Sequence, residues 1–134
     1  MTSIEDDSRC FVCGQDNPHG LKLDFDLSKE GARTRMRFPD YCQGWQGITH
    51  GGLVCTLLDE VMAKAGQAAG HDGVTAEMTV RFRKPVPTEV DVLVAGRIRE
   101  IRGRLASTEA EITDGEGNVL ASAKARFFIK DKNG

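Results

Sequence analysis

A histidine, two glycines and a carboxylate form the segment of this chain best suited to chemistry. The run Gly47-Ile48-Thr49-His50-Gly51-Gly52 leads into a stretch with helical periodicity that contains Asp59. The first N–H groups of a helix have no intrahelical partner and can donate to an anion, and glycine lets a ligand approach the backbone. This is the arrangement that an oxyanion hole needs. His50 could donate or accept at the same place, or could simply fix the loop.

The helix predicted over 51–69 carries an unusual face. Its apolar stripe contains Val54, Leu57 and Val61. The opposite face has small residues around one carboxylate, which permits close approach by a ligand or another chain: Gly52, Cys55, Thr56, Asp59, Ala63 and Gly66. Chance is the plain alternative, because Ala and Gly are common. We interpret Asp59 as functional, and Glu60 as structural, since it precedes Lys64 by four residues and could form an exposed ion pair.

The spacing of Gly51 and Asp59 predicts a homodimer. They are eight residues apart, so roughly 12 Å separates them along a helix. Groups that act on one carbonyl must converge to about 3 Å of it. If both act, Asp59 must meet Gly51 of a second copy, which gives two equivalent composite sites.

The elements that must position these residues are strands that precede and follow the helix in the sequence. Alternation of apolar and polar residues predicts two strands before it and four after it, over 21–28, 33–38, 75–82, 90–101, 105–113 and 119–129. Short turns between consecutive strands, including Asp114-Gly115-Glu116-Gly117-Asn118, imply an antiparallel sheet with the helix across one face. We therefore expect an α+β fold in a single domain over 1–134, with an irregular lead-in over 1–20.

Composition sets limits on partners and location. The 134 residues carry a net charge of −2, with 40% hydrophobic and 28% charged residues, which gives no overall attraction to nucleic acid or anionic lipid. The acidic N-terminal residues do not resemble a signal peptide, and no run of apolar residues is long enough for a membrane span. We expect a cytoplasmic protein.

The cysteines raise the question of a metal. Cys10-x-x-Cys13 with His19 and Cys42 could supply four zinc ligands. A single CxxC is weak, however, and no second pair has metal-ligand spacing. We therefore favour reduced cysteines and expect neither a metal nor a cofactor.

The residues resemble a known family. His50-Gly51-Gly52-Leu53 followed by Leu57-Leu58-Asp59-Glu60 is similar to the HGG…D signature of PaaI-like hotdog-fold acyl-CoA thioesterases, and two flanking blocks also match: Cys10-x-x-Cys13-Gly14…Asn17-Pro18-x-Gly20-Leu21 and Gly73-Val74-Thr75-Ala76-Glu77-Met78. The resemblance implies a curved sheet of about five or six strands wrapped around one long helix, in a homodimer or homotetramer.

The resemblance also implies roles for residues. Gly51 would supply the N–H that polarises a thioester carbonyl, Asp59 of the partner would act as nucleophile or general base, and Thr75 would help orient water. Gly52 and two basic segments would bind the acyl-CoA: Phe82-Arg83-Lys84 and Arg102-Gly103-Arg104. Cations there suit CoA phosphates, although charges at strand ends are often only solvated.

One departure from the family stands six residues before His50. Many members carry Asn or Gln there, and this chain has Gly44, with Gln43 and Gln46 out of register. Two alternatives to hydrolysis therefore stay open. One is an acyl-CoA-binding protein without catalysis. The other is a hydratase or dehydratase that pairs His50 with Asp59, although the spacing differs from that family's motif.

Overall fold

A computed structural model describes residues 4–130 of the chain. It contains one long helix and six strands, with a short 3-10 helix η1 (Asp40–Cys42) before the long helix. The elements follow the predicted order: β1 (Asp26–Ser28), β2 (Gly31–Met36), α1 (Gly51–Ala68), β3 (Gly73–Phe82), β4 (Val92–Arg102), β5 (Leu105–Thr113) and β6 (Val119–Ile129).

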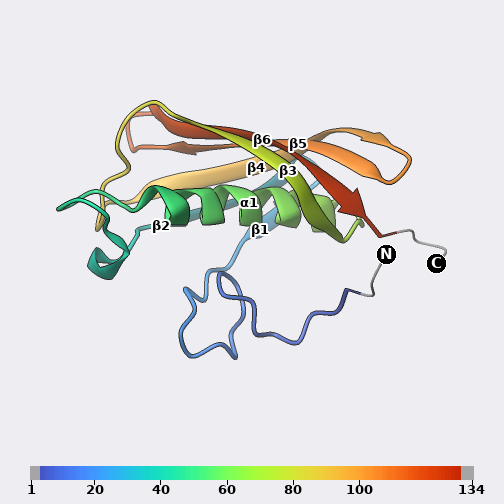
Figure 1. The fold of residues 1–134 in the computed structure, drawn as a ribbon, viewed down its shortest axis with the longest axis horizontal. Helices are drawn as coiled ribbons and strands as arrows, with labels where there is room; N and C mark the ends of the chain where they lie inside the picture. Colours follow the sequence, from blue (N-terminus) through green and yellow to red (C-terminus); the bar gives the residue numbers. More distant parts are fainter. Residues whose placement is uncertain (1–3, 131–134) are drawn as a thin grey trace.

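The strands form one antiparallel sheet in the order β1-β2-β4-β5-β6-β3. The sheet curves over α1, and the lead-in segment lies on the other side of the helix (Figure 1). This confirms the predicted α+β architecture of a curved antiparallel sheet around one helix. β1 and β3 are the edge strands, and of these only β3 is long.

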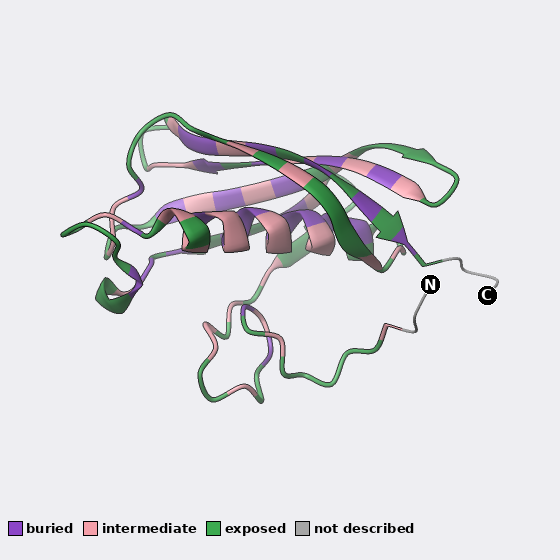
Figure 2. Cartoon of the chain, viewed as in Figure 1, coloured by how far each residue is buried: buried purple, intermediate pink, exposed green. Residues whose placement is uncertain are grey.

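The core lies between α1 and the concave side of the sheet. Leu57, Leu58, Val61 and Met62 are fully buried on the helix. Figure 2 shows buried residues along the side of α1 that faces the strands, with intermediate and exposed residues on the other side. The apolar stripe predicted for the helix is thus confirmed.

Gly96 of β4 lies where the backbone of α1 packs closely against the sheet. A Cβ there would be 3.0 Å from both Cγ1 and the carbonyl oxygen of Val61, and helix backbone cannot move without disturbing its neighbours. We expect Gly96→Ala to lower the free energy of unfolding by about 1–3 kcal/mol, measured by urea denaturation. The matched control is Gly115→Ala, because a Cβ at Gly115 meets nothing within 4 Å. Equal unfolding midpoints for the two variants would show that the contact is not restrictive.

The prediction of a strand over 21–28 was wrong for most of its length. Only Asp26–Ser28 form β1. The N–H groups of Leu21 and Leu23 instead donate to the carbonyls of Phe11 and Val12, at 2.8 and 2.9 Å. The residue between them, Lys22, has a φ of 54°, which an extended strand does not permit. The alternation still has a physical basis, because the side chains of Leu21 and Leu23 pack against the core.

The lead-in has no helix or strand between residues 4 and 25, which are turns and irregular backbone. Val12 is nevertheless 3% exposed and belongs to the core, so the segment is packed onto the domain. Within the described residues, no helix has the length and apolar character needed to cross a membrane.

Candidate functional site

His50 caps the N-terminus of α1. Its Nδ1 accepts a hydrogen bond from the N–H of Gly52 at 3.0 Å. Its backbone N–H donates to the carbonyl of Cys42 at 2.8 Å. A neutral imidazole whose Nδ1 accepts must carry its proton on Nε2. This hydrogen bond uses the N–H of Gly52 and holds the loop before the helix in place.

This cap gives a prediction about stability. His50→Ala removes the acceptor for the Gly52 N–H, and the loss of a side-chain cap costs about 0.5–2 kcal/mol. His50→Asn retains a cap of suitable length and should recover most of that stability. Thermal unfolding followed by circular dichroism measures both. Equal melting temperatures for the Ala and Asn variants would contradict a capping role.

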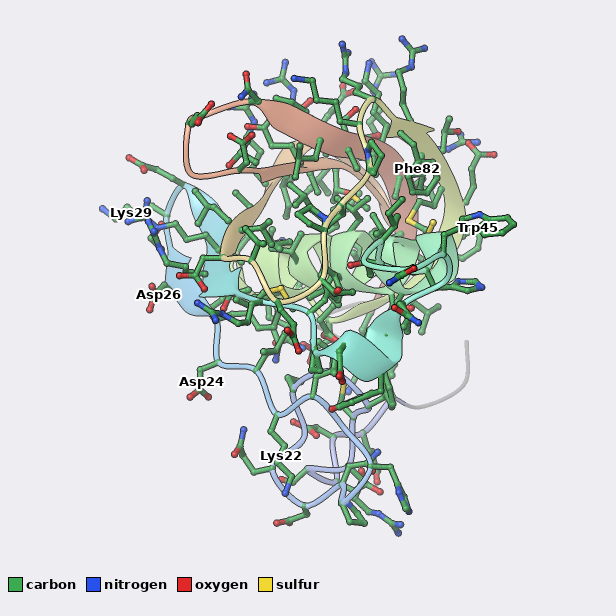
Figure 3. All side chains as sticks on the ribbon, turned by 90° about the vertical axis from the view of Figure 1, so that its left-hand side faces the viewer. Lys22, Asp24, Asp26, Lys29, Trp45 and Phe82 are labelled. Atoms are coloured by element: carbon green, nitrogen blue, oxygen red, sulfur yellow. The ribbon has the colours of Figure 1, made fainter. Side chains whose placement is uncertain are left out.

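Gly51 supplies the donor that the cap leaves available. It is the first residue of α1, so its N–H has no intrahelical acceptor. A Cβ at Gly51 would lie 3.6 Å from Cζ of Phe82, which places the Phe82 ring beside this donor. Figure 3 shows Phe82 and Trp45 on the same side of the molecule, at the end where α1 begins. Trp45 is 83% exposed, so this end of the helix presents aromatic surface.

Asp59 and Thr75 lie together, one on α1 and the other on β3. The hydroxyl of Thr75 donates a short hydrogen bond to Oδ1 of Asp59. Asp59 is partly buried, and the hydrogen bond fixes one carboxylate oxygen while the other stays available. The pairing of these two residues within one chain is what the sequence could not show.

A bulge in β3 makes this pairing possible. The register shifts between Thr75 and Glu77, with Thr75 opposite Phe127 and Met78 opposite Ala125 on β6. Both β6 partners are buried, at 4% and 5% exposure. Residues three apart on a regular strand face opposite sides, but the extra residue in the bulge brings Thr75 to the same side as Met78. Regular alternation along β3 from Met78 would place Thr75 on the face away from the helix, and the bulge reverses this.

Gly44 packs directly against His50. A Cβ at Gly44 would lie 3.3 Å from Cα of His50, so a larger residue here requires the cap to shift. Gln43 does not simply replace the Asn or Gln side chain that is missing at position 44, because its Oε1 accepts a hydrogen bond from the Gly47 N–H at 3.2 Å. Gln46 is exposed on the same loop.

The two basic segments lie at opposite ends of the sheet. Phe82 is opposite Ala121 at one end of β6, and Arg83 and Lys84 follow it. Leu105 is opposite Phe128 at the other end of β6, so the turn at Gly103 is remote from Lys84. One chain therefore does not bring together the residues that the resemblance assigns to CoA. Arg102 pairs with Glu100 at 2.7 Å.

A hollow of about 1060 Å³ on the surface has a lining rich in charged residues. It includes Arg81 and Arg83 but neither Gly51 nor Asp59, so it is not the place where a carbonyl would meet these groups.

The small-residue face predicted for α1 around Asp59 needs one correction. Gly66 is buried, because the N–H of His71 donates to its carbonyl at 2.8 Å and the turn covers it.

The four zinc ligands considered from the sequence do not come together. Among the described residues, the group that could hold a metal is Cys10, Cys13 and Glu60. Cys42 is buried in the core and His19 is exposed elsewhere.

Comparison with known proteins identifies the family to which this site belongs. The model of the thioesterase superfamily matches residues 46–121, a range that contains His50, Gly51, Asp59 and Thr75. The acyl-coenzyme A thioesterase THEM4 of Xenopus laevis is 28% identical over 90 residues, which are 67% of this chain and 40% of that protein. The chain therefore spans well under two thirds of the length of this relative.

Solved structures share the fold. A thioesterase superfamily protein has a TM-score of 0.85 and 26% identity, covering 90% of this chain and 60% of its own. A Streptococcus mutans protein bound to acetyl-CoA has a TM-score of 0.77 and 21% identity over 82% of this chain and 90% of its own. The PaaI protein of E. coli has a TM-score of 0.75 and 20% identity over 81% of this chain and 83% of its own. The chain has the hotdog fold and belongs to the thioesterase superfamily.

Proposed function

We propose that this protein is an acyl-CoA thioesterase that works as a homodimer. The observation that carries the proposal is the placement of Asp59, held by Thr75 on the open face of α1, and of the free first N–H at Gly51. The helix is continuous from Gly51 to Ala68, so roughly 12 Å separates the two groups within one chain. The names of the relatives and the acetyl-CoA held by the Streptococcus mutans protein support a CoA thioester as substrate.

The edge strand β3 offers a route to the dimer. Its outer edge has no strand beside it in the sheet order, and Val74 and Phe82 on this strand are 43% and 53% exposed. Long edge strands with apolar residues tend to pair with another chain. Antiparallel pairing of β3 with its copy would set the two α1 helices side by side, with the small-residue faces in contact. Light scattering after size exclusion would distinguish a dimer from a tetramer.

In the proposed reaction the Gly51 N–H donates to the thioester carbonyl oxygen and stabilises the negative charge that develops there. Asp59 of the other copy attacks the carbonyl carbon directly, or removes a proton from the water that attacks it. The C–S bond breaks, CoA leaves as the thiolate and takes up a proton, and the acid is released, after a second water attack if Asp59 was the nucleophile. Thr75 orients the carboxylate or the water.

The same pairing would bring the basic segments together. In an antiparallel pair of β3 strands, the Lys84 end of one copy lies beside the Gly73 end of the other. The Arg102-Gly103-Arg104 turn also belongs to the latter end. Arg83 and Lys84 of one copy, and the turn of the second copy, would then flank one CoA. Cations at such positions suit its phosphates.

A second candidate is acyl-CoA binding without turnover. It is favoured by Gly44, which packs against His50 at the position where many family members carry Asn or Gln. The experiment that separates the two is a panel of acyl-CoAs of different chain length, assayed by thiol release and, in parallel, by calorimetric binding. We expect thiol release from at least one acyl-CoA. Tight binding with no release across the panel would favour the second candidate, and hydration of an enoyl-CoA would favour a hydratase. The acyl preference comes from the same panel, and the cytoplasmic location stays a prediction.

A further inference from the structure

Two cysteines of the lead-in and a glutamate of α1 converge on one point. The Sγ atoms of Cys10 and Cys13 and a carboxylate oxygen of Glu60 all lie within 4.8 Å of one another. Sγ of Cys10 donates to Oε2 of Glu60 at 3.1 Å. Residues separated by 50 positions in the chain therefore present three metal-ligand atoms to a common centre. The expected ion pair between Glu60 and Lys64 does not describe this arrangement, because the carboxylate of Glu60 accepts a hydrogen bond from a thiol.

The backbone around the cysteines forms a tight turn that supports them. The N–H of Gly14 donates to the carbonyl of Cys10 at 2.9 Å, and the N–H of Val12 donates to Sγ of Cys10 at 3.4 Å. A Cβ at Gly14 would lie 2.4 Å from the nitrogen of Cys10, so only glycine fits. Backbone N–H groups directed at sulfur stabilise the thiolate form that binds metals.

A basic side chain lies beside the two thiols and the carboxylate. Lys64 interacts with Cys13 through a side-chain hydrogen bond and lies near enough to Glu60 and Cys10 to interact with their charges. It therefore places a positive charge next to the three candidate ligands.

We propose that Cys10, Cys13 and Glu60 bind one Zn²⁺ ion, with water as the fourth ligand. Two thiolates and one carboxylate are ligands that zinc accepts, and ligand atoms around a tetrahedral zinc lie about 3.8 Å apart, a spacing that small side-chain movements reach here. The ion, two thiolates and the carboxylate carry one negative charge in total, which Lys64 neutralises. The ion would fasten the lead-in to the helix.

This site is separate from the proposed carbonyl site. Glu60 follows Asp59 in the sequence, but adjacent helix residues are turned by about 100° from each other. Asp59 contacts Thr75 on β3, whereas Glu60 contacts Cys10 in the lead-in. The role assigned to zinc is structural, so the test does not depend on thioesterase activity.

The test uses the full chain, produced in zinc-supplemented medium and purified with a non-thiol reductant. We expect about one zinc per chain by elemental mass spectrometry. Replacement by Co²⁺ should give the thiolate-to-metal charge-transfer band and the visible bands of a tetrahedral site. Zinc titration of the metal-free protein should release roughly two protons per ion, measured by calorimetry in buffers of different ionisation enthalpy.

Two variants and a control decide the ligands. Cys13→Ser should abolish stoichiometric zinc, and Glu60→Gln should weaken zinc binding at least roughly tenfold while leaving the cysteine pair in place. Cys55→Ser removes a thiol from the same helix that is not in this group, and it should retain full zinc. A protein that neither contains zinc nor binds it at micromolar concentration would overturn the proposal. Zinc retained unchanged by both Cys13→Ser and Glu60→Gln would also overturn it.

Discussion

Asp59→Asn should lower kcat for acyl-CoA hydrolysis by roughly 10²- to 10⁴-fold, the usual contribution of a side chain that accepts a proton or attacks in the transition state. The amide has the same shape as the carboxylate, and its oxygen can still accept from the Thr75 hydroxyl. The substitution therefore removes charge and basicity without removing the contact between α1 and β3. Steady-state kinetics with the best substrate of the panel measure the change, and KM should move much less than kcat.

The matched control is Asp72→Asn, which makes the same chemical change at an exposed position in the turn after α1. It should hydrolyse acyl-CoA at a rate within a few-fold of the unmodified protein. If Asp59→Asn and Asp72→Asn were equally active, Asp59 would have no part in the chemical step. Calorimetric binding of a non-hydrolysable acyl-CoA analogue to Asp59→Asn verifies that the variant still binds its ligand.

Gly51→Pro is expected to reduce kcat by roughly 10²- to 10³-fold, because it deletes one N–H donor to the developing oxyanion. Proline is well tolerated at the first position of a helix. His50 has a φ of −57° and a ψ of 131°, a conformation that a residue before proline accepts. Gly51→Ala is the comparison variant, since it keeps the N–H and its Cβ would meet Phe82 at an ordinary 3.6 Å. A loss in the Ala variant as large as that in the Pro variant would indicate a steric cause.

Mixing the two inactive variants tests whether the site is shared between copies. In a heterodimer of Asp59→Asn and Gly51→Pro, one composite site carries both changes and the other carries neither. Random exchange of subunits should therefore restore roughly a quarter of the original activity. If each chain held a complete site, mixing would restore nothing. Co-expression with two different affinity tags allows the heterodimer to be isolated and assayed alone.

Much of this fold could be predicted because its signals are local. The apolar stripe from Val54 to Val61 is repeated at helical spacing, and strands β4 to β6 alternate regularly between short turns. The failure over 21–28 has a physical cause. The positive φ of Lys22 and the hydrogen bonds of Leu21 and Leu23 to the lead-in are tertiary features, and alternation of apolar residues looks the same whether or not a strand pairs with the sheet.

The residues of the candidate site could be proposed from the sequence, but their contacts could not. The helix start at Gly51 and the distance to Asp59 follow from sequence spacing alone. The bond from Gly52 to His50 depends on a side-chain conformation, and the contact of Glu60 with Cys10 joins segments 50 residues apart. Neither leaves a periodic signal. The Cys10-Phe11-Val12-Cys13-Gly14 turn was visible in the sequence, but its third ligand was not.

The bulge in β3 divides that strand into two parts whose alternation between the faces of the sheet is out of step by one residue. Downstream of it, Met78 alternates in step with the core, and upstream of it Thr75 is displaced by one position so that it meets Asp59. A substitution at Ala76 would leave the register on both sides of the bulge unchanged. A single-residue deletion there would leave Thr75 opposite Phe127 and on the same side as Met78. Loss of the bulge by a one-residue slip of the upstream part, which pairs Ala76 with Phe127, would instead carry Thr75 to the outer face. Within this fold, the Asp59–Thr75 pair can thus be gained or lost through strand register, with both residues of the pair unchanged.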